Sequence, residues 1–328
     1  MENTTDAPPP PFARSIALAV GAILIGTLAS CSSSDDQPSP PAETIDYSFA
    51  GYSAQIPADP QRVVVIDSRT SLEFALLADY PIVALDYDES SHLASKVPAD
   101  AGHLGGNLSK EDVLSYNPDL ILISVGWYES YKSQNLTFED IAPVLVIQDG
   151  SSPDKETESL GGPLGFMGEQ LALLGKTAAA SAAQARYEAA LATARDDVGS
   201  VAQTKTIAFV SLIEDKFFVF NTPNNLTVDV ASSLGYTILS NDAITAAQSA
   251  AIGGYSAEFG WENADVLADA DVVVAQNLDS WPGNPAWDRV PAVAAGNVAP
   301  LDYDDKVGFA LTYTDFLNKL ADTTRNLQ

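Results

Sequence analysis

The feature that most constrains the fold of this chain is an alternation of short apolar runs with helix-like segments. In the first half the apolar runs, rich in Val, Ile and Leu, fall at residues 62–67, 81–86, 118–124 and 143–148. Segments 71–80 and 110–116 between them have the pattern of helices. Continuous apolar runs of this length are typical of strands buried on both faces of a parallel sheet. The alternation therefore predicts an α/β layer fold.

The same alternation begins again after residue 204. The strand-like runs of the second half lie at 205–212, 216–221, 236–240, 271–277 and 297–302. A last helix is expected at 313–322. The two halves also share a short sequence pattern. In the first, Glu111 is followed by a short helical stretch and by Asp119, which opens a strand. Glu262 and Asp271 repeat this order with one extra residue between them, so two related α/β halves are expected.

Between the halves lies a proline-free segment, residues 168–198, rich in Ala, Leu, Glu and Arg. These residues favour helix, and the 31 residues would span roughly 45 Å as one helix. A helix of that length can brace two lobes. The predicted fold class is therefore α/β, with two Rossmann-like lobes, each a mainly parallel sheet with flanking helices, joined by one long helix.

The single cysteine, Cys31, lies where an apolar run meets a polar segment. Arg14 is followed by 16 residues without charge, a length that suits a signal peptide better than a membrane span. The run ends in Leu-Ala-Ser-Cys, which resembles the lipobox of bacterial lipoproteins. The resemblance implies cleavage after Ser30 and lipid on Cys31, hence an extracytoplasmic protein anchored to the membrane. The alternative is a core cysteine after an ordinary signal peptide. One cysteine permits neither an internal disulfide nor a thiolate metal cluster.

The segment that follows Cys31 is rich in Ser, Asp and Pro and carries few bulky apolar side chains. Such a segment cannot bury enough surface to order itself, so a tether is expected. The predicted organisation is a signal peptide (1–30), lipidated cysteine and tether (31–46), first lobe (47–162), connecting long helix (163–200) and second lobe (201–328).

The charge balance excludes one class of partner. The chain carries 16 basic and 44 acidic residues, a formal net charge of −28. Nucleic-acid binding needs clustered Lys and Arg, so it is not expected. The sequence also lacks a G-x-S-x-G elbow, a P-loop, an HExxH motif and a G-x-G-x-x-G after a strand. We therefore predict a protein that is not an enzyme, although a secreted two-lobed α/β enzyme and a surface receptor without a permease remain alternatives.

From about Pro57 to its end the chain resembles the helix-hinged, class III periplasmic substrate-binding proteins of iron-siderophore, haem and cobalamin importers. The resemblance is carried, in this order, by PQRVVVIDSRTSLEFALLADYPIVAL, LGGNLSKEDVLSYNPDLILIS, FEDIAPVLVI and PAWDRVPAVAAGNVAPLD. It implies a monomeric, membrane-tethered binding protein that captures a ferric siderophore in the inter-lobe cleft and delivers it to an ABC permease. Haem or cobalamin is the alternative ligand. Little lobe closure is expected, because a helix bends less than strand hinges.

In this family a glutamate on each lobe meets arginines of the permease. The family phrase places this role on Glu111 and, in the second lobe, on Glu262, with Glu258 as a rival. An exposed carboxylate at a helix start is favoured by the helix dipole and stays free to pair with a partner cation. The alternative interpretation is that these acids only stabilise their helices.

Ligand-binding residues are expected on loops at the strand ends. Arg69 follows the first strand directly and could pair with oxygens of an iron chelate, or form a structural ion pair. Aromatic residues after other strands offer flat apolar area with a polar edge. The aromatic candidates are Tyr87, then Trp127, Tyr128 and Tyr131 in a presumed loop, and Trp281 across the cleft. Packing within loops is their alternative role, and Phe217 and Phe220 are assigned to the core.

Direct metal binding is not expected, because the chain has only two histidines, His92 and His103. No metal site and no intrinsic cofactor are therefore predicted, and iron is expected to arrive as an Fe(III)-siderophore chelate. Axial haem ligation by Tyr or His stays open. The acidic balance favours a neutral or cationic hydroxamate over an anionic catecholate.

Overall fold

The computed structural model describes residues 43–67, 69–86, 91–105, 108–149, 161–222, 225–250 and 256–327. The predicted signal peptide and Cys31 lie outside these ranges, and so does Tyr87. Residues from Ala42 to the C-terminus form one compact unit. Among the described helices, none combines the length and the apolar character needed to cross a bilayer.

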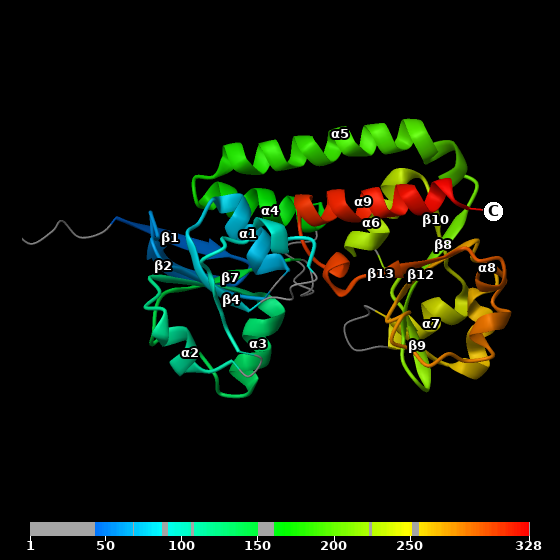
Figure 1. The fold of residues 1–328 in the computed structure, drawn as a ribbon, viewed down its shortest axis with the longest axis horizontal. Helices are drawn as coiled ribbons and strands as arrows, with labels where there is room; N and C mark the ends of the chain where they lie inside the picture. The colour runs from blue at the N-terminus through cyan, green and yellow to red at the C-terminus, as the bar shows by residue number, and fades with distance from the viewer. Residues whose placement is uncertain are drawn as a thin grey trace, which may run out of the picture. The chain divides into compact units, whose positions relative to one another are not determined.

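The first lobe is built on a five-stranded parallel sheet of order β5-β4-β3-β6-β7 (Figure 1). Its strands are β3 (Val63–Ile66), β4 (Ile82–Asp86), β5 (Gly102–His103), β6 (Leu120–Ser124) and β7 (Val144–Ile147). Helices α1 (Thr70–Ala78), α2 (Lys110–Ser115) and α3 (Val125–Ser133) accompany them. An antiparallel hairpin that the sequence did not predict, β1 (Thr44–Phe49) with β2 (Tyr52–Pro57), precedes the sheet. The residues of the inner strands β3 and β6 and of the edge strand β7 are all buried.

The second lobe repeats the plan with antiparallel strands at one edge. Its sheet has the order β11-β9-β8-β12-β13, and β10 also pairs with β8. The strands are β8 (Thr206–Leu212), β9 (Lys216–Val219), β10 (Thr237–Ile238), β11 (Ala257–Gly260), β12 (Val272–Gln276) and β13 (Val298–Leu301). Pairs that include β9 are antiparallel, and the others are parallel. The helical elements are α6 (Leu226–Leu234), α7 (Asp242–Ala250), α8 (Pro291–Ala294) and the short 3₁₀ helices η3 (Trp261–Leu267), η4 (Trp287–Arg289) and η5 (Tyr303–Lys306). The predicted α/β class with two mainly parallel sheets is confirmed.

The sequence pattern shared by the two halves, an aspartate just before a strand, has the same structural role in each lobe. Asp119 precedes β6, and its carboxylate accepts hydrogen bonds from the backbone N–H groups of Gln61 and Arg62, just before β3. Asp271 precedes β12, and its carboxylate accepts from the N–H of Thr206, the first residue of β8. In both sheets the aspartate therefore fixes where the two central strands begin relative to each other.

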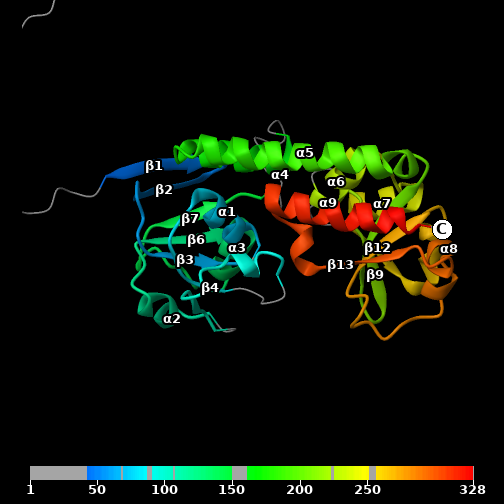
Figure 2. The ribbon, with the colours of Figure 1, turned by 45° about the horizontal axis from the view of Figure 1, so that its top comes forward.

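The prediction of a single helix at 168–198 is wrong, because two helices share this segment. Helix α4 (Gly162–Leu173) ends within it, and α5 (Thr177–Ala202) begins after three intervening residues. Gly175 lies between them with φ +71°, a left-handed conformation typical of helix C-termini. Figures 1 and 2 show α5 running alongside the last helix, α9 (Ala310–Arg325), and the two helices contact each other.

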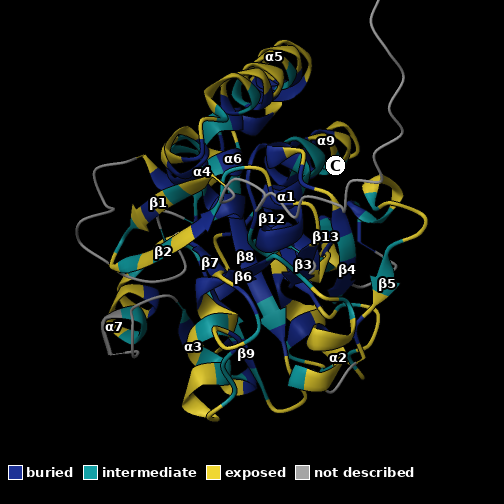
Figure 3. Ribbon diagram, turned by 90° about the vertical axis from the view of Figure 1, so that its left-hand side faces the viewer, coloured by how far each residue is buried: buried dark blue, intermediate teal, exposed yellow. Residues whose placement is uncertain are grey.

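Helix α9 connects the cores of the two lobes. Phe309, at its start, packs edge-on against Phe74 of α1 with 6.1 Å between ring centroids. Further along, Phe316 contacts Phe209 of β8 at 6.2 Å. These residues belong to one continuous buried cluster that also includes Tyr187 of α5. Figure 3 shows the buried sheets and the exposed outer side of α5. The lobes are therefore joined by apolar packing as well as by chain connections.

Candidate functional site

Charged side chains gather at the carboxyl ends of β3 and β4. Asp67 directly follows β3 with φ +99°, an uncommon conformation for a residue other than glycine. Its Oδ1 accepts a hydrogen bond from Nε of Arg69 at 3.1 Å, while its Oδ2 is buried and has no hydrogen-bond partner among the described residues. Asp86 ends β4, and burial together with the charge of Asp67 raises its pKa. The strand ends therefore carry two carboxylates beside one guanidinium, and one carboxylate oxygen of Asp67 has no hydrogen bond among the described residues.

Arg69 extends from this edge to the other lobe. Its guanidinium lies over the ring of Tyr303, 4.4 Å from the centroid, and Tyr303 belongs to η5, just after β13. The side chain of Arg69 is only 14% exposed. Burial would lower the pKa of Arg69, but Asp67 opposes this and the pKa is raised. Arg69 therefore stays charged at the junction of the lobes, while Tyr303 keeps 52% of its surface exposed.

A second cation reaches the same region from the second lobe. Lys306 donates from Nζ to Oε1 of Gln276 at 3.0 Å, and its ammonium lies 4.7 Å from the ring centroid of Phe220. Burial, together with the charge of Arg69, lowers the pKa of Lys306. Asp304 is buried nearby, and burial raises its pKa. Two cations and several carboxylates thus lie at the junction of the lobes. The cations can bind oxygen acceptors of a ligand, and the carboxylates can bind its polar donors.

The aromatic segment after β6 is a helix, α3, and not the expected loop. Trp127 and Tyr131, four residues apart, stack on one face of it at 5.6 Å. The pKa of Tyr131 is raised by burial and by Asp86 and Asp67, so this face lies toward the strand ends. Tyr128 instead packs against Tyr52 and lines a cavity of about 480 Å³ between β2 and β7. The structure therefore places Tyr131 near Asp67, the partner of Arg69, with Trp127 stacked on Tyr131, and directs Tyr128 elsewhere.

Trp281 lies within an aromatic cluster of the second lobe. Its ring centroid is 4.7 Å from that of Trp261 and 5.9 Å from that of Trp287. Its Nε1 donates to the backbone oxygen of Ile213 at 3.1 Å. These contacts match the alternative of loop packing, although Trp281 remains partly exposed. Phe217 and Phe220 are buried, as expected of core residues.

Comparison with known proteins decides the family. The family model described as periplasmic binding protein matches residues 84–304, more than half of the chain. The chain belongs to the periplasmic binding protein family. No curated protein sequence matches it significantly.

Solved structures of siderophore-binding proteins share the fold of this periplasmic binding protein. The siderophore binding protein from the fuscachelin gene cluster of Thermobifida fusca aligns with 22% identity and TM-score 0.56, over 83% of this chain and 99% of that one. FhuD from S. pseudintermedius aligns with 17% identity and TM-score 0.62, over 87% and 99%. FhuD2 from Staphylococcus aureus, solved with bound ferrioxamine B, aligns with 15% identity and TM-score 0.61, over 81% and 98%.

The acids expected to meet a permease lie on the surface of this binding protein. Glu111 is exposed in the first turn of α2, and Glu262 is exposed in the first turn of η3. Their rival Glu258 forms an ion pair with Lys216 at 3.1 Å, which leaves it less available to a partner. Glu262 also lines a cavity of about 260 Å³ that it shares with Asp265 and Arg289.

The sequence analysis did not identify the residues that the second lobe contributes to this site. Tyr303, Asp304 and Lys306 follow β13 in the phrase LDYDDK, at the carboxyl end of a strand. That position was a usable signal, because ligand-binding loops of parallel sheets cluster there. The contact between Arg69 and Tyr303 was not predictable, since it depends on how the two sheets are placed by α9.

Proposed function

We propose that this chain is the lipid-anchored solute-binding protein of an ABC importer and that it captures a ferric siderophore between its two lobes. Membership of the periplasmic binding protein family supports binding over catalysis. Structural neighbours from Staphylococcus aureus and Vibrio cholerae were solved with ferrioxamine B and with Fe³⁺-Desferal. Lipid on Cys31 would hold the protein beside the membrane, and Glu111 and Glu262 would dock it to the permease.

The observation that carries the proposal is the position of Arg69. It is a largely buried cation at the carboxyl end of a parallel strand, and it touches Tyr303 of the other lobe. A planar guanidinium binds pairs of oxygen atoms well, and iron chelates present such oxygens. Lys306 adds a second cation, and Trp127 and Tyr131 add a stacked aromatic surface. Tyr87, Tyr128 and Trp281 remain proposed ligand contacts from the sequence.

The local charges favour one type of chelate. Among the described residues of this site, the carboxylates Asp67, Asp86 and Asp304 outnumber the cations Arg69 and Lys306. A highly anionic chelate would meet these carboxylates unfavourably, whereas a neutral or cationic hydroxamate chelate would not. We therefore propose a ferric hydroxamate as the ligand.

The test is a titration of tryptophan fluorescence against ferric hydroxamates, ferric catecholates, haem and cobalamin. The expected result is tight quenching by a ferric hydroxamate, weakened at least about tenfold by Arg69→Ala because a charged hydrogen bond is lost. Arg186→Ala, on the exposed side of α5, is the matched control and leaves the affinity unchanged. Tight quenching by haem or cobalamin alone would contradict the proposed ligand.

A further inference from the structure

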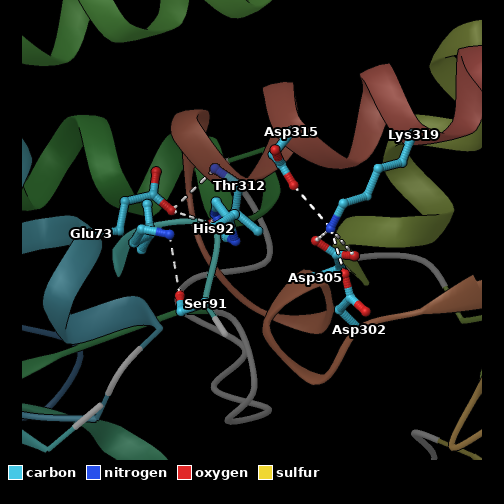
Figure 4. Close-up of polar contacts among 9 residues, drawn as sticks. Glu73, Ser91, His92, Asp302, Asp305, Thr312, Asp315 and Lys319 are labelled. Atoms are coloured by element: carbon cyan, nitrogen blue, oxygen red, sulfur yellow. Dashed lines mark hydrogen bonds and ion pairs between the residues drawn. The ribbon is translucent and has the colours of Figure 1, made fainter. Parts of the chain in front are cut away.

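A second polar cluster lies between the segment after β4 and helix α9, next to the residues around Arg69. It contains His92, Asp305 of η5 and Asp315 of α9 (Figure 4). One nitrogen or oxygen atom from each residue lies within 4.8 Å of the others. Asp305 is 1% exposed, and His92 and Asp315 are half-buried. Three side chains from separate elements thus bring donor atoms to one point.

The hydrogen bonds around His92 assign a donor role to its Nε2. The carboxylate of Glu73 accepts from the backbone N–H groups of Phe309, Leu311 and Thr312, and from the hydroxyl of Thr312 at 2.6 Å. Because that hydroxyl gives its only proton to Glu73, it can only accept from His92. In the contact of 3.2 Å between Nε2 of His92 and Oγ1 of Thr312, Nε2 is therefore the donor. Nδ1 takes no part in this network.

The other ring nitrogen of His92 has no partner among the described residues. Its Nδ1 is buried and makes no hydrogen bond. A buried polar atom without a partner costs free energy, and an imidazole nitrogen is a common ligand of transition-metal ions. A ring nitrogen of His92 and one oxygen of each aspartate lie within 4.8 Å of one another. The unpartnered nitrogen is therefore an observation, separate from the acidic residues, that points to a bound cation.

The charge balance leaves room for such a cation. The ammonium of Lys319 contacts Asp302 at 2.7 Å, Asp305 at 2.9 Å and Asp315 at 3.0 Å. One positive charge thus serves three carboxylates. A carboxylate offers about four lone-pair sites over its two oxygens, so it can bind an ammonium on one side and an ion on another. Figure 4 shows Lys319 and His92 approaching the aspartates from different sides.

We infer that His92, Asp305 and Asp315 form a binding site for one divalent first-row transition-metal ion. One imidazole and two carboxylates are donors that suit Zn²⁺, Co²⁺ or Mn²⁺, whereas Mg²⁺ and Ca²⁺ prefer sites made of oxygen alone. The sequence predicted no metal site because it has only two histidines, and the fold places one of them beside two aspartates. The ion would link the segment after β4 to η5 and α9, and so tie the first lobe to the second.

The experiment is a calorimetric titration of the untagged, chelator-treated full chain with Co²⁺, Zn²⁺, Mn²⁺ and Mg²⁺. We expect one Co²⁺ or Zn²⁺ ion per chain, a Co²⁺ absorption band that a chelator removes, and a higher melting temperature with metal. His92→Ala is expected to weaken Co²⁺ binding by more than about tenfold, because an inner ligand is lost. Asp315→Asn, at a half-exposed position that should tolerate the change, is expected to weaken it as well.

His103→Ala is the matched control, because His103 is the only other histidine and lies on β5. It is expected to leave Co²⁺ binding unchanged. The inference is overturned if no ion binds, if binding survives His92→Ala, or if Mg²⁺ binds as tightly as Co²⁺. No siderophore is used, so this result is independent of the proposed function.

Discussion

Glu73 joins the first lobe to the start of α9 through four hydrogen bonds. It is fully buried in α1, and its carboxylate accepts three backbone N–H groups and a hydroxyl at the start of α9. The first N–H groups of a helix lack partners within the helix, and a negative charge there is favoured by the helix dipole. Glu73 thus caps α9 from a distant part of the chain. Gly308 permits this approach, since a Cβ there would lie 2.9 Å from the Glu73 carboxylate.

Glu73→Ala is expected to lower the free energy of unfolding by about 3 kcal/mol or more, because it leaves buried N–H groups without a partner. Glu73→Gln keeps the shape but turns an amide N–H₂ toward N–H donors, so a loss of about 1 to 3 kcal/mol is expected. Urea unfolding followed by circular dichroism measures both. Glu188→Ala on the exposed side of α5 is the control, with a change within about 0.5 kcal/mol. Equal stability of Glu73→Ala and the parent would disprove the role.

The sequence identified some of these residues and not others. Arg69 could be selected because it directly follows an apolar run and basic residues are scarce. Glu73 does not stand out in the sequence, because an acid in a helix is usually exposed. Yet the helix around it is apolar on nearly every side, and such a helix is buried. A lone acid in a buried helix therefore indicates a buried carboxylate. Its partners in α9 could not be predicted from the sequence.

Among the elements, the buried strands were predicted well and the irregular elements were not. All predicted strands of the first half appear as β3, β4, β6 and β7, because four or more buried apolar residues leave few alternatives. The loop predicted around Trp127 is helix α3, since its mixed composition gave no clear period. The break at Gly175 was signalled by the glycine itself, which interrupts an otherwise strong helix pattern.

Two tyrosine–glutamate pairs hold α3 in place, one to the hairpin and one to the turn before β7. Tyr52 donates to Glu129 at 2.8 Å and Tyr128 to Glu139 at 2.7 Å, and the rings meet edge to face at 5.7 Å. Burial, together with the partner glutamate, raises the pKa of each phenol to about 12. A raised phenol pKa stabilises the folded chain fully below about pH 10, and this contribution is lost as the pH rises through about 12.

Replacing both partners, Glu129→Gln with Glu139→Gln, is expected to lower the two phenol pKa values toward the ordinary value of about 10. At about pH 11 the double variant should then show more tyrosinate absorbance than the parent, in which both phenols remain mostly protonated. Glu214→Gln, at an exposed turn of the second lobe, is the control. Unchanged tyrosinate absorbance in the double variant would mean that the carboxylates do not hold these protons.

For the molecule as a whole, α9 and α5 decide how far the lobes can move. Phe309 and Phe316 anchor α9 in the first and second lobes, and Tyr313 between them packs on Tyr187 of α5 at 5.2 Å. A packed core resists continuous deformation. This is a physical reason to keep the sequence-based prediction of little closure on binding. The two lobes themselves were predictable, because the strand pattern repeats, but the core that joins them depends on contacts between residues far apart in the sequence.

The proposed docking role of Glu111 and Glu262 can be tested separately from ligand capture. Glu111→Ala with Glu262→Ala is expected to reduce uptake of ferric siderophore into cells at least about tenfold, because each removes a charge for a partner cation. Neither acid lies among the residues around Arg69, so the affinity for the chelate, measured by fluorescence, should stay the same.

Glu258→Ala is the matched control, because its carboxylate is already paired with Lys216. If Glu258→Ala alone abolishes uptake, the docking acid of the second lobe is Glu258. If the double variant loses chelate binding as well as uptake, these acids belong to the ligand site and not to a docking surface.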